Sequence, residues 1–328
     1  MKFIVNNYSD VFGGQERYIL NLTRYLSDKG FYVIFRGQPE ELSFKSSLSY
    51  SDIKSDSCDV RILNGNRAIY LFTLKKKRGE FWVYVHHSNI NDRQGTYLKS
   101  IIRKFLLFIS LKRADLVVRV CNNALPEFYA PGKVITIYNG VDLPEYRPKV
   151  SLSNNVNLLM VGAVNKNKNQ QLAIELLVKQ PNAYLTIVGD GSDINSLKRY
   201  AEQLGVSERI HWTGFVTELD KYYRDADFLL MLSHFEAFPY SVLEAMSNGT
   251  PVIAVPVGGV PEIIKSGVNG WLVEDYAVNT LAEKINQVCS EPQQYIKVAS
   301  NARRTIETSF TKQTMFNMLL TEIKKRKI

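Results

Sequence analysis

Two glutamates and a pair of lysines carry the clearest chemical signal in this sequence. Glu236 and Glu244 lie on either side of the expected start of a short helix, which Pro239 can begin because its missing N–H is not needed there and which Gly249 is placed to end. Carboxylates accept hydrogen bonds from sugar hydroxyls, and a helix N-terminus offers N–H groups and partial positive charge to a phosphate. The stretch therefore predicts a site for a phosphate-linked sugar.

The two lysines precede another expected helix. Lys166 and Lys168 lie in the loop after a strand that ends at Gly162, where an ammonium can neutralise a diphosphate held by backbone N–H groups. The alternative is that both lysines lie in solvent and bind no ligand, as lysines in loops commonly do. The signal gains weight because Glu236, Glu244 and Gly258-Gly259 follow neighbouring strands of the same expected sheet.

The first half opens with a strand at residues 2–6, the turn Gly13-Gly14 and a helix from Gln15. This unit resembles a dinucleotide-binding turn without its G-x-G-x-x-G order, so the two glycines either admit a ligand close to the backbone or only make a tight turn. A second candidate is the strand 81–85, which delivers His86 and His87 to its carboxyl end, the end where parallel α/β sheets bind ligands. Alternation puts the two rings on opposite sides; we favour His86 slightly, and a structural role for either is the alternative.

Alternating strands and helices must position these residues. Hydrophobic runs separated by helical periodicity predict an α/β protein of two doubly wound parallel-sheet domains with a crevice between them. We expect a first domain at residues 1–148, a second at 149–306 and a last helix with a basic tail at 307–328. Residues 37–57 are polar, and we expect a loop there.

Composition limits the possible functions. The chain has 328 residues, of which 45% are hydrophobic, and three widely spaced cysteines that favour a reducing compartment over a disulfide framework. Four histidines without H-E-x-x-H or paired C-x-x-C give a metal site little support. No signal peptide and no uninterrupted apolar run of ~20 residues is apparent, so we expect a soluble or peripherally attached protein.

Positive charge is concentrated in the first half. Of the net charge of +9, residues 1–148 carry +8, from 22 Lys and Arg against 14 Asp and Glu. A basic surface of this kind can bind an anionic membrane, an anionic substrate or nucleic acid. The alternative is that these charges are only exposed to solvent and bind no partner. Residues 97–113 are an apolar helix punctuated by basic side chains, which either packs on the sheet with its lysines at the edges or lies in a membrane interface.

Several motifs in order resemble one known family over nearly the whole chain. They are E-x7-E at Glu236 to Glu244, followed by A-M-S-N-G-T-P and G-G-V-P-E; G-G-Q-E at residues 13–16; N-G-V-D at 139–142; G-D-G at 189–191; and G-V-N-G-W-L-V at 267–273. Together they are similar to the retaining glycosyltransferases of family GT4, which have the GT-B fold. One departure is Ala163, where the family commonly has a basic residue.

The resemblance implies a hexosyltransferase that moves a sugar from a nucleotide-sugar donor, with retained configuration, to a hydroxyl of a glycan acceptor. It also implies that the first domain binds the acceptor, that the second binds the donor, and that the last helix returns to the first domain. It implies catalytic roles for His86, Glu236 and Lys168, with Glu236 at the sugar and Lys168 at the diphosphate. It places Glu244 at the ribose and makes Lys166 the candidate to replace the basic residue that is missing at Ala163. The donor-binding residues that it implies are Gly13, Gly14, Lys166, Gly189, Phe238, Pro239, Glu244 and Gly259.

The basic first half suggests where such an enzyme works. We expect an acceptor that is a glycan, lipid-linked at an anionic membrane, in synthesis of a bacterial-type surface polysaccharide such as O-antigen, capsule or lipopolysaccharide. We expect the protein in the cytoplasm, peripheral on the inner face of the cell membrane, with no cofactor, no metal and no nucleic-acid partner. The alternatives are a GT-B-type nucleotide-sugar epimerase and a non-catalytic nucleotide-sugar-binding protein.

Overall fold

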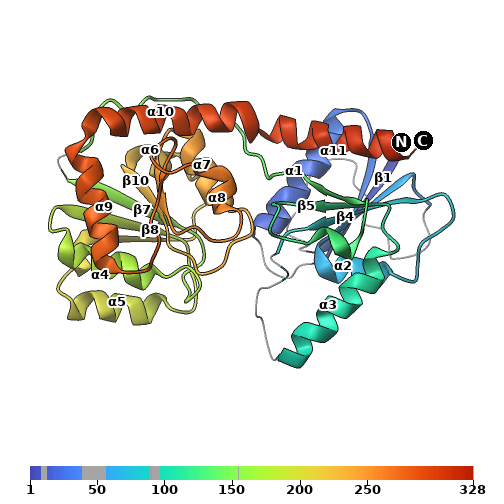
Figure 1. Ribbon diagram of the computed structural model, residues 1–328, viewed down its shortest axis with the longest axis horizontal. Coiled ribbons are helices and arrows are strands. Elements are labelled where there is room, and N and C mark those ends of the chain that lie inside the picture. Colours follow the sequence, from blue (N-terminus) through green and yellow to red (C-terminus); the bar gives the residue numbers. More distant parts are fainter. Residues whose placement is uncertain (9–12, 39–56, 89, 91–96, 154, 328) are drawn as a thin grey trace. The chain divides into compact units, whose positions relative to one another are not determined.

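The chain folds into two units. The computed structural model describes residues 1–8, 13–38, 57–88, 90, 97–153 and 155–327, and the structural statements below concern these residues. One unit comprises residues 1–139 and 312–328, and the other comprises residues 140–311. Each contains a six-stranded, all-parallel sheet with helices on both faces (Figure 1), which confirms the predicted fold class.

The first unit has strand order β2-β1-β3-β4-β5-β6. Its strands are β1 (Lys2–Tyr8), β2 (Tyr32–Gln38), β3 (Val60–Asn64), β4 (Phe81–His86), β5 (Leu116–Arg119) and β6 (Val134–Thr136). Its helices are α1 (Gly14–Asp28), α2 (Gly65–Phe72), α3 (Tyr97–Leu111), the 3₁₀ turn η1 (Glu127–Tyr129) and α11 (Lys312–Arg326). The order reverses between β1 and β3, which is where such sheets bind ligands, at the carboxyl ends of the strands.

Burial explains why these strands read as continuous apolar runs. Every residue of β3 and β4 is buried, because helices cover both faces of a parallel sheet. In α1, Tyr18, Leu22 and Leu26 are fully buried on one face. Helix α11 packs against α1, where the Phe316 ring contacts Tyr18.

The second unit has strand order β12-β11-β10-β7-β8-β9 and reverses between β10 and β7. Its strands are β7 (Val156–Val161), β8 (Ala183–Val188), β9 (Ile210–Gly214), β10 (Phe228–Met231), β11 (Val252–Ala254) and β12 (Trp271–Leu272). Its helices are α4 (Gln170–Lys179), α5 (Ile194–Gln203), the 3₁₀ turn η2 (Ser207–Arg209), α6 (Asp220–Asp225), α7 (Tyr240–Ser247), α8 (Val260–Ile263), α9 (Val278–Ser290) and α10 (Pro292–Ser309).

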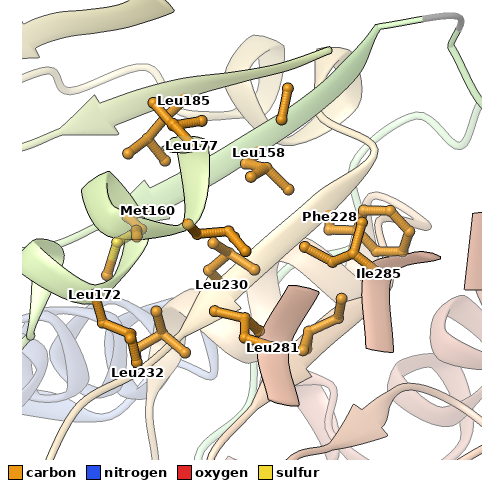
Figure 2. Close-up of a cluster of buried hydrophobic side chains, with 14 of the residues drawn as sticks. Leu158, Met160, Leu172, Leu177, Leu185, Phe228, Leu230, Leu232, Leu281 and Ile285 are labelled. Atoms are coloured by element: carbon orange, nitrogen blue, oxygen red, sulfur yellow. The ribbon is translucent and has the colours of Figure 1, made fainter. Parts of the chain in front are cut away.

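The core of this unit lies between the sheet and helices α4 and α9. Figure 2 shows Leu172 and Leu177 of α4 and Leu281 and Ile285 of α9 against strand residues such as Leu230. All five are at most 5% exposed. This packing holds the carboxyl ends of β7 and β10 beside each other.

Some boundaries differ from the sequence-based expectations. The units divide at residue 139/140 rather than 148. Helix α11 belongs with the first unit, where the family resemblance places the last helix. Helix α2 ends at Phe72, before the basic run at residues 75–78 begins. The loop expected at 37–57 lies mostly outside the described residues. None of the described helices is long and apolar enough to cross a membrane.

Candidate functional site

Lys168 and Glu236 meet at the switch point of the second unit. Lys168 follows β7 and Glu236 follows β10, the two strands between which the order reverses. Lys168 Nζ donates to Glu236 Oε1 at 2.5 Å, and both side chains are mostly shielded from solvent. The sequence predicted both residues for one site, and the fold brings them into contact.

Asn167 holds the two loops together. Its Oδ1 accepts from the Phe235 amide at 3.0 Å, its Nδ2 donates to the Phe235 carbonyl at 3.1 Å, and its carbonyl accepts from the His234 amide at 2.8 Å. The sequence gives no signal for this role, because the partners are backbone groups. Asn167 therefore fixes the distance between the lysine loop and the glutamate loop.

Glycines allow the loops at the ends of β7 and β8 to touch. A Cβ on Gly189, whose φ is +138°, would lie 2.0 Å from the Gly162 carbonyl oxygen, and one on Gly191 would lie 2.2 Å from the Val164 carbonyl oxygen. A Cβ on Gly162 would meet Lys168 Cε at 3.2 Å, so the lysine stem lies against Gly162. Gly189, predicted as a donor-binding residue, therefore stands beside the Lys168 loop.

Another glycine, Gly258, packs against the backbone of Glu236. Gly258 has a φ of +54°, and a Cβ there would lie 1.6 Å from the Glu236 carbonyl oxygen. The neighbouring Gly259 is buried and its amide donates to the Ala237 carbonyl at 2.8 Å. The pair thus holds the backbone that carries Glu236, and the Gly259 amide is already engaged within the protein.

Glu244 lies on α7, and its Oε2 accepts from the Tyr223 hydroxyl at 2.9 Å. Pro239 is the N-cap of α7 rather than its first residue, and Gly249 follows the helix with a φ of +73°. Phe238 and Pro239 are buried, with the Phe238 ring packed on Phe310 at 5.6 Å. These two predicted donor-binding side chains therefore face the protein interior, because the loop turns inward to start α7.

Lys166 and Ala163 are both exposed in the loop after β7. Gln170, at the start of α4, donates its Nε2 to the Ala163 carbonyl at 3.0 Å and is 2% exposed. The backbone at Ala163 is therefore anchored although its side chain is small.

In the first unit, a cavity of about 290 Å³ opens at the switch point between β1 and β3. Gly13 caps α1 and Gly14 is its first residue, and both are exposed beside this end of the sheet. Neither glycine lines the cavity. The described residues that do line it are Tyr8, Gln15, Gly65, Asn66, Arg67, His87 and Ser88.

The structure places His87, not His86, at this cavity. His86 is 1% exposed and its Nδ1 lies 2.7 Å from the Tyr84 hydroxyl. The sequence slightly favours His86, but as the last residue of buried β4 this ring lies in the core, and alternation puts the next ring on the other side. His86 Nε2 finds no partner among the described residues.

The hydrogen-bond network defines the state of the His87 ring. Asn64 Nδ2 donates to Asn7 Oδ1 at 2.9 Å and to the Gln15 carbonyl at 3.2 Å. Asn64 Oδ1 therefore faces His87 Nε2, at 2.7 Å. Because a carbonyl oxygen only accepts, Nε2 carries the hydrogen and Nδ1 is left as an acceptor.

Both imidazoles are neutral at neutral pH. Burial lowers the pKa of His86 to about 4. Burial, with a smaller contribution from the His86 charge, lowers the pKa of His87 to about 3. The acceptor nitrogen of His87 therefore remains unprotonated across the physiological range.

The chain is similar in sequence to known glycosyltransferases. Residues 144–305 match the family model of glycosyl transferases group 1. The chain is 31% identical over 197 residues to an uncharacterized glycosyltransferase of Methanocaldococcus jannaschii, covering 55% of this chain and 50% of the relative. It is 25% identical over 221 residues to the N-acetyl-alpha-D-glucosaminyl L-malate synthase of Bacillus anthracis, covering 62% and 58%. It thus matches about half the length of these curated relatives.

The structural likeness extends over the whole chain. The crystal structure of Anabaena HepE in complex with UDP superposes with a TM-score of 0.86, covering 99% of this chain and 100% of HepE at 19% identity. HepE has also been solved with UDP-glucose. These matches confirm the resemblance to glycosyltransferases: the chain has the two-sheet GT-B fold, and its residues 144–305 match the glycosyl transferases group 1 family.

Proposed function

We propose that this protein is a glycosyltransferase that moves a sugar from a nucleotide-sugar donor to a hydroxyl of a glycan acceptor. The observation that carries the proposal is the contact between Lys168 and Glu236 at the switch point of the second unit, within the region that matches the group 1 model. Switch points are where α/β sheets bind nucleotides. The likeness to HepE, which was solved with UDP and UDP-glucose, supports a uridine nucleotide as the first donor to test.

Lys168 and Glu236 share the donor in this proposal. An ammonium has three N–H donors, and Glu236 takes one of them. The others can bind the diphosphate at the start of α4, where the helix N-terminus adds favourable charge. The second oxygen of Glu236 can accept from a sugar hydroxyl, and Glu244 accepts from a ribose hydroxyl.

The chemistry is departure of a nucleoside diphosphate. Negative charge grows on the leaving oxygens, and Lys168 stabilises it in a partly desolvated site without a metal or other cofactor. Glu236 is a positioning group rather than a covalent nucleophile, since its carboxylate is tied to Lys168. We therefore propose retention of configuration by same-face substitution, in which the leaving phosphate helps to deprotonate the acceptor.

The first unit would bind the acceptor. Its cavity of about 290 Å³ lies near the lower end of the ~300–1,000 Å³ typical of small-molecule pockets. His87 offers an unprotonated Nδ1 and Asn66 an amide, both suited to sugar hydroxyls. The +8 charge of residues 1–148 favours an acceptor at an anionic surface, so we propose a lipid-linked glycan in surface-polysaccharide synthesis on the cytoplasmic face of the membrane.

The proposal is tested by calorimetric titration of UDP and UDP-glucose into the wild type and Lys168→Met. Losing a charge-assisted hydrogen bond of about 1.5–3 kcal/mol should weaken UDP binding by roughly 10- to 100-fold. Lys179→Met is the matched control, because Lys179 is exposed at the far end of α4, and should bind like the wild type.

A titration series of other nucleoside diphosphates follows if UDP does not bind. No binding of any nucleotide or nucleotide sugar would refute the proposal, as would equal affinities for the wild type and Lys168→Met. Conversion of the donor sugar without any acceptor would indicate an epimerase instead.

A further inference from the structure

Helix α3 is apolar on the side that faces solvent as well as on the side that faces the protein. On the inner side, Leu107 and Leu111 are 2% and 0% exposed. The same side is anchored to α2 and the turn after it: the Tyr70 hydroxyl donates to the Arg103 carbonyl, and the Thr73 hydroxyl donates to Ser110 Oγ at 2.8 Å. These contacts fix the orientation of α3 on the first unit and so determine which of its side chains face solvent.

The outer side carries six large apolar side chains at helical spacing, which we call the α3 outer face. They are Leu98 (66% exposed), Ile101 (46%), Ile102 (49%), Phe105 (62%), Leu106 (46%) and Ile109 (40%). A surface helix of a soluble domain normally presents polar residues on this side. A contiguous exposed apolar stripe of this kind marks a site of interaction.

The segment that carries the α3 outer face contains basic residues and no acidic ones. Residues 97–113 contain no Asp or Glu, and they contain five basic residues: Lys99, Arg103, Lys104, Lys112 and Arg113. Lys112 and Arg113 are exposed at the end of the stripe. The turn after α2 lies beside this end, since Lys76 Nζ donates to the Arg113 carbonyl at 2.9 Å.

This turn repeats the same combination of side chains. Leu74 is 88% exposed and is followed by the basic run 75–78. Of these, Lys76 is neutralised by Asp115 at 2.5 Å, while Lys75 and Arg78 add positive charge at the edge of the face. Apolar side chains with a cationic rim fit the boundary between lipid headgroups and acyl chains.

A second copy of the chain fits this surface poorly. Pairing two α3 outer faces would bury the apolar stripe but bring two sets of like charges together, which repel each other. An anionic bilayer accepts the apolar side chains and also neutralises the rim. The positive charge around the α3 outer face therefore favours an anionic bilayer over a second copy of the chain as the binding partner.

We propose that the α3 outer face and the turn after α2 dock the protein on an anionic membrane. This deepens the proposed function, on which it rests for a lipid-linked acceptor. The surface acts by partial insertion of its apolar side chains, with Phe105 central and the basic rim contacting anionic headgroups.

The test is co-flotation with vesicles of phosphatidylcholine alone or mixed with phosphatidylglycerol, at low and high salt. The wild type should float with the anionic vesicles and bind much less at high salt, because screening weakens the contribution of the rim. Ile102→Ser with Phe105→Ser should reduce binding at least about tenfold, from lost apolar burial. Lys112→Gln with Arg113→Gln should reduce it roughly 10- to 30-fold on anionic vesicles at low salt, about fivefold per charge.

Matched controls come from the second unit. Phe215→Ser removes an aromatic ring that is 70% exposed, and Lys179→Gln with Lys297→Gln removes two exposed lysines of that unit. Both should float like the wild type. Absence of binding by the wild type, or equal loss in the controls, would overturn the proposal.

Two further readouts separate the outcomes. The proposal is overturned if the wild type is a dimer without lipid and never floats, while the Ile102→Ser with Phe105→Ser variant is a monomer. That result would show that the α3 outer face joins two copies of the chain. UDP binding is measured on every variant. Retained UDP binding without flotation refutes the docking surface alone, whereas flotation without nucleotide binding refutes the proposed function alone.

Discussion

Gly258 offers the sharpest test of how the fold positions Glu236. In Gly258→Ala the new methyl group would lie 1.6 Å from the Glu236 carbonyl oxygen, where real contacts stay beyond 3.0 Å. The glutamate loop must therefore move by more than an ångström. The residue also has a φ of +54°, which an alanine adopts only at a cost.

The two costs can be estimated separately. An L-residue in the left-handed region loses about 1–2 kcal/mol, and forced repacking of a filled site costs about 1–3 kcal/mol. We expect the free energy of unfolding to fall by about 2–5 kcal/mol in total. Displacing a positioning group by about 1 Å lowers turnover by about a hundredfold, so sugar transfer should fall by about that factor in the fraction that remains folded.

Gly205→Ala is the matched control. Gly205 has a φ of +67° in the same unit, and a Cβ there meets nothing within 4 Å. It should lose only the conformational cost of about 1–2 kcal/mol and keep the wild-type rate of the proposed sugar transfer. Urea denaturation measures the loss of stability, and an assay of the proposed sugar transfer measures the loss of turnover. Equal stability losses in the two variants, together with unchanged turnover in Gly258→Ala, would refute this account of the glutamate loop.

Two further predictions concern ionisable residues buried in the first unit. The pKa of His86 falls from 6.5 to about 4 on folding, so the unfolded chain binds more protons between these values, and stability should drop as pH falls from 6.5, by about 2 kcal/mol at about pH 5. Urea denaturation at several pH values should show that the free energy of unfolding depends less on pH in His86→Gln than in the wild type; an unaltered pH dependence would contradict the assignment. Glu80→Gln should lower the free energy of unfolding by about 3–5 kcal/mol, because it leaves the buried Arg61 guanidinium, now 2.9 Å from the carboxylate, without its anion. The same change at the half-exposed Glu307 should cost less than about 1 kcal/mol, and similar losses at the two positions would argue against a buried pair.

Local pattern was sufficient to predict the alternation of strands and helices and the two parallel sheets. Buried parallel strands read as apolar runs, and the glycines that end them are needed for close approach of backbones. The same pattern placed Lys168 and Glu236 at strand ends of one sheet. Their contact follows from the strand order, which brings the ends of β7 and β10 together.

Other features depend on contacts between residues far apart in the chain, and so only the tertiary structure decided them. Alternation predicted that His86 and His87 point in opposite directions, but the packing of β4 determines which one reaches the cavity. Phe238 belongs to a motif that suggests ligand binding, yet its ring packs on Phe310. Helix α3 shows the same limit: its apolar residues lie on more than one side of the helix, and only its docking against α2 shows which six of them remain in solvent. Periodicity is a property of neighbours along the chain, whereas burial depends on what lies across from them.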